Sequence, residues 1–495
     1  MLIYIKNLSL KHSINLLFCL FPISFVIGSL IVTLNLYLFL ILCIIYIKKK
    51  NYKLNFDYSG SILICFFLSI VISSAINHFE GEWINTNQDV VQEHPLLVAI
   101  THGYFVRSIL LLRFVILYFV VQTLLINNQL SLKEFFISSF LCTGFVSFDV
   151  IVQYFFGYNL LGYKWWTGEI SGFFFEEAIA GGYIQKFSLL SIFGLLFFLK
   201  EKKYKKQAVF IIVLLLTLGT FLASNRMNFL LLFFSLIFLS LITKEIRYAI
   251  ISSLLVFISI SVILVNADES LKKRYSRFLI IDGLFINNIF YSIIYSSNTT
   301  DTETKNKEEK LKKSVELNTT LPMHFRIYRT ALESWKNSPI IGWGHKSYRV
   351  NCSDIVKAKP KTFTPVCSSH PHNYQIQVLH NSGLVGFVLI SVFVFMFLLK
   401  VFKILINKNY RPHTMYLIPI VMTLFIEIWP IKSTGSLFST WNGTVVWLII
   451  AFSTILNTNF TKKNLDEPLN NRKSLLLGVT ITLFGSLIIK RLFFI

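Results

Sequence analysis

Charged residues are scarce in this sequence, and acidic residues are scarcer than basic ones. Only 15% of the 495 residues are charged, with 25 Asp and Glu against 47 Lys and Arg, whereas 54% are hydrophobic. This composition excludes an ordinary soluble protein and predicts an all-α polytopic membrane protein. Most lysines fall in short runs between apolar segments, as basic residues do in cytoplasmic loops. We therefore predict that the chain contacts membrane lipids and does not bind nucleic acid.

Cleavage sites, repeats and cysteines are also few or missing. No small-residue cleavage site follows the first apolar run, so we expect that run to remain as the first helix. No repeat of solenoid period is present. Four of the six cysteines lie in apolar runs and are expected to be small core residues. Only Cys352 and Cys367, which flank a polar loop, are placed to form a disulfide.

Apolar runs close to the length of a membrane-spanning helix recur along the chain. Such a helix needs about 20 residues, and by this measure we predict about twelve or thirteen spans. They lie near 13–29, 32–47, 59–76, 104–126, 135–156, 183–199, 207–222, 229–243, 248–265, 384–401, 413–429, 442–457 and 474–489. The predicted organisation is nine helices in 1–265, one large loop in 266–383, and the C-terminal helices in 384–495.

The loops alternate between lysine-rich and lysine-poor along the chain. Loops such as 48–53, 200–206 and 403–411 are rich in Lys and Arg, which predicts that they face the cytoplasm. The large loop 266–383 then faces outward and has structure of its own. Residues 279–294 are expected to lie along the membrane interface, 298–320 to be a solvated insertion, and 323–337 to be a helix. A second helix is predicted from Tyr374 toward Gly383.

Five ionisable residues within or beside the apolar spans are candidates for function. Arg107 and Arg113 have an ordinary explanation, since either can pair with Asp149 or reach the interface. Glu427 is the only other acid in this group. Arg226 occupies a short outer turn, where a guanidinium can meet an anion or simply reach the membrane surface.

The outer loop carries further candidates. Arg326 and Arg329 are three residues apart, so they share a helix face that suits phosphate oxygens, although Glu333 offers an ordinary helix pair. His370 and His372 stand just ahead of the predicted Tyr374 helix. They are candidates for a metal site, for hydrogen-bonded loop histidines, or for a general base. The metal interpretation has the thinnest ligand set, because only His380 lies nearby.

Together these residues form a pattern that resembles the O-antigen ligase and polymerase superfamily of bacterial membrane enzymes. His372-Asn373, nine residues, and then Gly383-x-x-Gly386 match its histidine motif. An arginine helix with Trp335, followed by Pro-x-x-Gly-x-Gly at 339–344, matches a second motif. The short turn with Arg226 and an acidic outer segment with Glu177 match two more. Phe387 departs from the usual Thr of the ligases.

The resemblance implies a GT-C-like membrane glycosyltransferase that needs no metal and no cofactor. Its donor would be a glycan on undecaprenyl diphosphate, and its acceptor the lipid A core or a second glycan-lipid. His372 would be the base of an inverting transfer, with support from Asn373 and His370. Arg226, Arg326 and Arg329 would bind the diphosphate. The enzyme would lie in the inner membrane with its catalytic loop in the periplasm, where a Cys352–Cys367 disulfide would constrain the loop.

Three alternatives remain open at the level of sequence. An O-antigen or exopolysaccharide polymerase shares the donor and the fold, but no Arg is followed ten residues later by Gly, as in one type of polymerase. A lipid-linked glycan flippase is expected to show internal repeats and charges lining many spans. A non-catalytic assembly protein would not need the histidine motif. The pattern favours the ligase-like enzyme.

Overall fold

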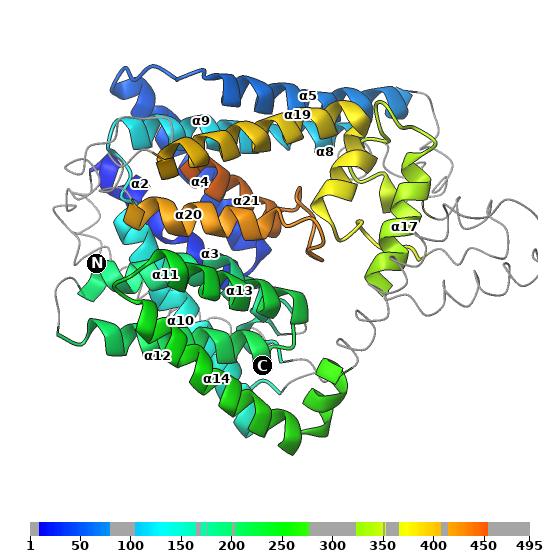
Figure 1. Ribbon diagram of the computed structural model, residues 1–495. Helices are drawn as coiled ribbons and strands as arrows, with labels where there is room; N and C mark the ends of the chain where they lie inside the picture. Colours follow the sequence, from blue (N-terminus) through cyan, green and yellow to red (C-terminus); the bar gives the residue numbers. More distant parts are fainter. Residues whose placement is uncertain are drawn as a thin grey trace, which may run out of the picture.

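The computed structural model describes residues 9–79, 104–164, 170–175, 177–199, 203–276, 323–349, 352, 366–406 and 414–453. These residues form helices joined by loops, with no strand among them (Figure 1). The predicted all-α class is confirmed. The helices are α2 (Leu10–Cys19), α3 (Phe21–Ile27), α4 (Ser29–Lys49), α5 (Tyr58–Phe79), α8 (Tyr104–Ile109), α9 (Leu112–Ile126), α10 (Leu132–Phe156), η1 (Gly172–Phe174), α11 (Ala180–Leu199), α12 (Lys205–Leu222), α13 (Arg226–Ile242), α14 (Arg247–Ala267), α17 (Met323–Trp335), α19 (Tyr374–Ile406), α20 (Thr414–Glu427) and α21 (Thr440–Phe452).

The described helices make this a multi-pass membrane protein. Eight are long and apolar enough to cross a bilayer, and α2 and α3 together form a ninth candidate span bent by 50°. Helices α13, α20 and α21 are apolar but shorter. Each of the first twelve predicted spans therefore corresponds to a helix or a helix pair. The predicted span 474–489 and the predicted segments 279–294 and 298–320 lie outside the described residues.

The bundle has a phenylalanine-rich interior and an apolar exterior. Phe18 packs on Phe135 with ring centroids 4.8 Å apart, and Phe67 packs on Trp447 at the same distance. Large apolar side chains such as Ile263 on α14 are exposed, as expected where a helix faces lipid. Helices distant in sequence lie side by side, for example α5 and α19 (Figure 1). Trp441 at the start of α21 donates a hydrogen bond to the carbonyl of Phe25 in α3 at 3.0 Å.

Helix α17 stands at one end of the bundle (Figure 1). It is amphipathic, and Ile327 and Ala331, spaced four apart, are buried while Arg329 is exposed. It ends at Trp335, two residues before the predicted end, and the indole of Trp335 donates to the carbonyl of Pro339 at 3.1 Å. This bond holds the segment 339–344 against the helix end.

The glycine motifs bring segment 339–344 against a kink in α19. Gly383 has φ 60° and ψ −159°, so the predicted break between two helices is confirmed at this residue. The amides of Trp343 and Gly344 donate to the carbonyls of His380 and Asn381, at 2.8 and 2.9 Å. The backbones approach so closely that a Cβ on Gly383 would lie 2.2 Å from the carbonyl oxygen of Ile340. The kink thus fixes the position of segment 339–344 on the bundle.

We expect Gly383→Ala to destabilise the protein strongly. The added methyl group would meet the Ile340 backbone, and the backbone conformation at Gly383 is essentially confined to glycine, so that an L-residue there pays a further cost of about 1–3 kcal/mol. The measurement is the thermal unfolding midpoint of the detergent-purified variant. Gly144→Ala is the matched control, because its Cβ would make ordinary contacts of 3.5 Å or more. Equal midpoints for the two variants would contradict this account of the kink.

Candidate functional site

A polar cavity of about 980 Å³ opens where α17 and the loops at its side meet the bundle. Residues from α8, α9, α11, α17, α19 and the loop 433–439 line it. The charged lining residues are five lysines and arginines and one glutamate: Arg107, Arg113, Lys186, Lys346, Arg349 and Glu177. Four histidines also line the cavity: His324, His345, His370 and His372. The cavity therefore has a strongly positive lining.

His372 sits in this cavity on a strained stretch of backbone. Its φ is 55°, in the left-handed region that is uncommon for residues other than glycine. Its carbonyl accepts a hydrogen bond from the amide of Thr434 at 2.9 Å and another from the hydroxyl of Tyr328 at 3.4 Å. Such strain is held in place by its surroundings and is common at functional sites.

Four of the six non-glycine residues with positive φ belong to segments around the cavity. They are Phe175, Ser224, Lys346 and His372, and the other two are asparagines, which adopt this conformation readily. Lys346 and His372 line the cavity directly, whereas Ser224 lies two residues before Arg226. Strained backbone clusters at functional sites, so these residues make this end of the bundle a candidate functional site.

The environment favours a neutral imidazole at His372. Burial lowers the pKa of His372, and a hydrogen bond with the backbone of Thr434 opposes the shift. The ring lies 4.1 Å from that of His370 and 5.2 Å from that of His324. Burial, together with the charge of His372, lowers the pKa of both neighbours to about 4. Near neutral pH the three rings are uncharged, so His372 is able to accept a proton.

Asn373 and Tyr374 anchor His372 to the start of α19. The side-chain oxygen of Asn373 accepts from the amide of Ile376 at 3.1 Å, as an N-cap does, and its nitrogen donates to the carbonyl of Pro430 at 2.7 Å. The hydroxyl of Tyr374 accepts from the side chain of Asn442 at 2.9 Å. The histidine is therefore held between α19 and the loop that precedes α21.

A buried ion network lies beneath this anchor. Glu427 at the end of α20 receives hydrogen bonds from both Lys186 and Lys432, the latter at 2.6 Å. Lys432 also donates to Gln185 at 2.7 Å, and the Tyr374 hydroxyl lies 3.5 Å from Glu427. All three charged groups are almost fully buried. Glu427 was a candidate from sequence, but nothing in the chain near it identified Lys186 as its partner.

A second set of cations lies on the side of the cavity formed by α8 and α9. Arg113 donates to the hydroxyl of Thr440 at 3.3 Å and lies over the ring of Phe114. Of the two ordinary explanations for Arg107 and Arg113, pairing with Asp149 is not among the ion pairs between described residues, and Asp149 accepts a hydrogen bond from the amide of Leu160 at 2.8 Å. Both arginines face the cavity instead. Lys346 and Arg349 join them and were missed by sequence reasoning, because a loop lysine or arginine has no distinguishing pattern.

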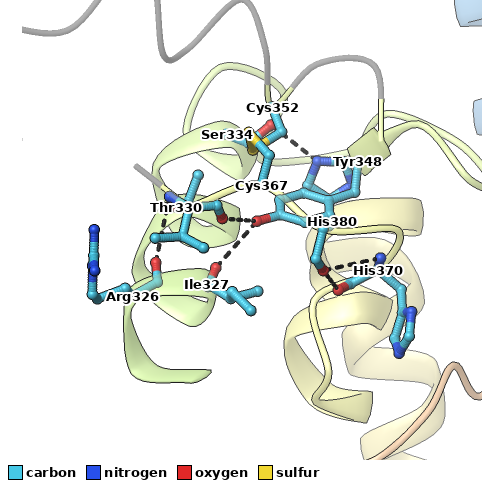
Figure 2. The surroundings of a disulfide bond; sticks show 11 residues. Arg326, Ile327, Thr330, Ser334, Tyr348, Cys352, Cys367, His370 and His380 are labelled. Atoms are coloured by element: carbon cyan, nitrogen blue, oxygen red, sulfur yellow. Dashed lines mark hydrogen bonds between the residues drawn. A yellow bond between two sulfur atoms is a disulfide. The ribbon is translucent and has the colours of Figure 1, made fainter. Parts of the chain in front are cut away.

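The three arginines predicted to bind a diphosphate do not line the cavity. Arg226 is exposed at the start of α13 and donates to the carbonyl of Arg274 at 3.3 Å, yet its charge contributes to lowering the pKa of His324. Arg329 is exposed on α17. The side chain of Arg326 points to the side of α17 opposite His370 (Figure 2). Of these three arginines, Arg226 is the one whose charge contributes to the pKa shift of a histidine that lines the cavity.

The remaining predicted residues surround the site. Cys352 and Cys367 form a disulfide whose Cα atoms are 5.6 Å apart, packed against α17 (Figure 2). Gly386 packs against Ser382 and α5. Glu177 lines the cavity and is exposed to solvent. His380 is buried between the hydroxyls of Ser334 and Ser347, so it links α17 to α19 and does not line the cavity.

The fold and the site define a class: a multi-pass, all-helical membrane protein with a histidine in a cation-lined cavity. Residues 210–391 match the family model for the O-antigen ligase. The matched segment runs from α12 into α19 and contains Arg226, the 339–344 motif and His372. It confirms the predicted resemblance to the O-antigen ligase superfamily and supports a glycan-transferring enzyme that acts on lipid-linked substrates. A search of curated proteins gives no match.

Proposed function

We propose that the protein transfers a glycan from undecaprenyl diphosphate to an acceptor such as the lipid A core, at the periplasmic face of the inner membrane. The observation that carries the proposal is the neutral imidazole of His372 in a cavity lined by cations. Its place within the segment that matches the O-antigen ligase family adds support. A ligase is favoured over a polymerase by the absence of an Arg with Gly ten residues later.

In the proposed reaction His372 takes the proton of an acceptor hydroxyl. The oxygen forms a bond to the anomeric carbon on the face opposite the carrier, while the bond from that carbon to the diphosphate oxygen breaks. Inversion follows from this direct displacement. The diphosphate leaves with the bonding electrons, and positive charge fixed near the leaving oxygen stabilises it. No metal is needed for these steps.

Arg226 remains the proposed cation for the departing diphosphate. Its charge reaches the histidine group, as its contribution to lowering the pKa of His324 indicates. Arg326 and Arg329 are proposed only as an outer source of positive charge on α17, because they do not line the cavity. Asn373, His370, Trp335, Glu177 and the two glycines Gly383 and Gly386 would hold the site in shape.

A strain that lacks this protein tests the proposal. If the protein is a ligase, the strain accumulates long glycans on the carrier and none on lipid A core. Accumulation of single repeat units on the carrier would instead identify a polymerase. Unchanged glycans on both carrier and acceptor would refute both functions. The products are distinguished by mass spectrometry of extracted lipid-linked glycans.

The pH dependence of transfer tests the role of His372. A base acts in its neutral form, and burial disfavours the charged form, so activity is expected to persist below the usual histidine pKa of about 6.5. As the pH falls through the lowered pKa, kcat/KM should decline. The measurement is the initial rate of transfer by protein in nanodiscs across a pH series. An acidic limb with an apparent pKa above 7 would contradict the assignment.

A further inference from the structure

The cavity contains more positive charge than the departing diphosphate explains. Arg107, Arg113, Lys346 and Arg349 line it together, and Glu177 is the one carboxylate in the described lining. None of these four cations forms an ion pair within the described part of the chain. Like charges brought together in this way repel one another unless an anion lies between them.

The four cations act on one another and on the histidines. Partial burial lowers the pKa of Lys346, and the charges of Arg107, Arg349 and Arg113 lower it further. Arg107 and Arg113 also contribute to lowering the pKa of the buried His345, to about 3. Arg349 contributes in the same way at His370, whose ring lies 4.1 Å from that of His372. The cluster therefore adjoins the proposed base.

The guanidinium of Arg113 has an unused hydrogen-bond donor that a ligand could fill. Its Nε is shielded from solvent and has no hydrogen-bond partner, while one terminal nitrogen donates to Thr440. An unmade hydrogen bond on a guanidinium is costly, and a bound oxyanion would satisfy it. A phosphate brings more negative charge and more acceptor oxygens than a carboxylate, which suits four converging cations better.

We propose that Arg107, Arg113, Lys346 and Arg349 form a second anion site, which binds a phosphorylated sugar of the acceptor beside His372. The proposal rests on the proposed function, because it assigns Arg226 to the carrier and the cluster to the other substrate. The two cationic regions come from different elements, α13 for Arg226 and α8, α9 and the 343–349 loop for the cluster. The acceptor of this enzyme is thus a phosphate-bearing glycan whose nucleophilic hydroxyl lies near its phosphate.

Direct binding tests the proposal with defined probes. The full chain in phosphatidylcholine nanodiscs is titrated with glucose 6-phosphate, with uncharged glucose, and with undecaprenyl diphosphate. We expect wild type to bind glucose 6-phosphate at least about tenfold more tightly than glucose. The double variant Arg107→Gln, Arg349→Gln should lose that preference. Arg226→Gln and the surface control Lys336→Gln should keep it.

Competition separates the two sources of phosphate. Undecaprenyl diphosphate should bind the double variant normally and should leave glucose 6-phosphate in place on wild type. If it displaces glucose 6-phosphate and loses affinity for the double variant, the cluster is the site of the carrier, which overturns the assignment to the acceptor. Equal binding of glucose and glucose 6-phosphate by wild type would show that the cluster is no phosphate site.

Two further measurements are made. The thermal unfolding midpoint distinguishes loss of binding from misfolding, and transfer by His372→Ala distinguishes failure of this proposal from failure of the proposed function. Because the double variant removes repulsion, its thermal unfolding midpoint without ligand should exceed that of wild type, as when a functional site is relieved of strain. A lower midpoint would contradict the repulsive cluster. His372→Ala should bind both probes yet fail to transfer glycan. Should wild type transfer nothing, the binding results still decide the phosphate site.

Discussion

Replacing His372 with alanine is expected to reduce glycan transfer by about 10²–10⁴-fold, the usual contribution of a general base. The histidine lines the cavity, its burial favours the neutral form, and its backbone is fixed by Thr434 and Tyr328. The measurement is the single-turnover rate with protein in nanodiscs in excess over the donor and with saturating acceptor. Saturation separates the loss of a base from the loss of binding.

A matched control is a histidine at the other end of the bundle. His12 at the start of α2 does not line the cavity, so His12→Ala should transfer at the wild-type rate. His372→Gln gives a second check, because it keeps a polar side chain but has no basic nitrogen. Transfer by either His372 variant within a few-fold of wild type would remove His372 from the role of base.

Glu427→Gln is expected to destabilise the protein by about 3–5 kcal/mol, the usual cost of leaving a buried charge without its partner. The carboxylate bridges Lys186 and Lys432, and its loss leaves two buried ammonium groups beside each other. The measurement is the thermal unfolding midpoint in detergent at pH 7. Adding Lys432→Gln to the variant should recover part of the loss, because only one buried ammonium then remains.

The pH dependence of the Glu427→Gln variant gives a sharper test. Burial lowers the pKa of Lys432, and the carboxylate opposes this shift in the wild type. Without the carboxylate the lysine binds its proton more weakly in the folded than in the unfolded chain. Stability should therefore rise as the pH increases from 7 toward the unfolded pKa of about 10.4. A variant whose midpoint stays flat over this range would indicate that Lys432 is hydrated rather than buried.

The sequence predicted the regular parts of this molecule because their signals are local. Apolar runs identified the helices, the spacing of Ile327 and Ala331 identified α17, and Gly383 marked the break in α19. His372 and Glu427 were candidates from the sequence, one through its motif and the other through its position in an apolar span, and their roles stay predictions. In each case the informative residues lie within a few positions of one another.

The composition of the cavity was not predictable in the same way. Arg107 and Arg113 were expected either to pair with Asp149 or to reach the membrane interface, whereas both line the cavity together with Lys346 and Arg349, which come from a distant loop. Lys186 meets Glu427 across 241 positions of sequence. Such long-range contacts depend on how α8, α11 and α20 pack, and a local sequence pattern does not predict this packing. Arg326 and Arg329 both lie on α17, the predicted helix, but neither of them lines the cavity.

The bond between Trp441 and the carbonyl of Phe25 has a consequence for biosynthesis. It joins residues 416 positions apart, and Trp441 is itself a wall of the cavity. A membrane chain emerges from the ribosome starting at its N-terminus, so the first helices must wait in the bilayer until α21 arrives. A ribosome-stalled chain that ends before α21 should already display α17 and its disulfide, yet it cannot bind either substrate. Completion of the cavity is therefore expected to be among the last events of assembly.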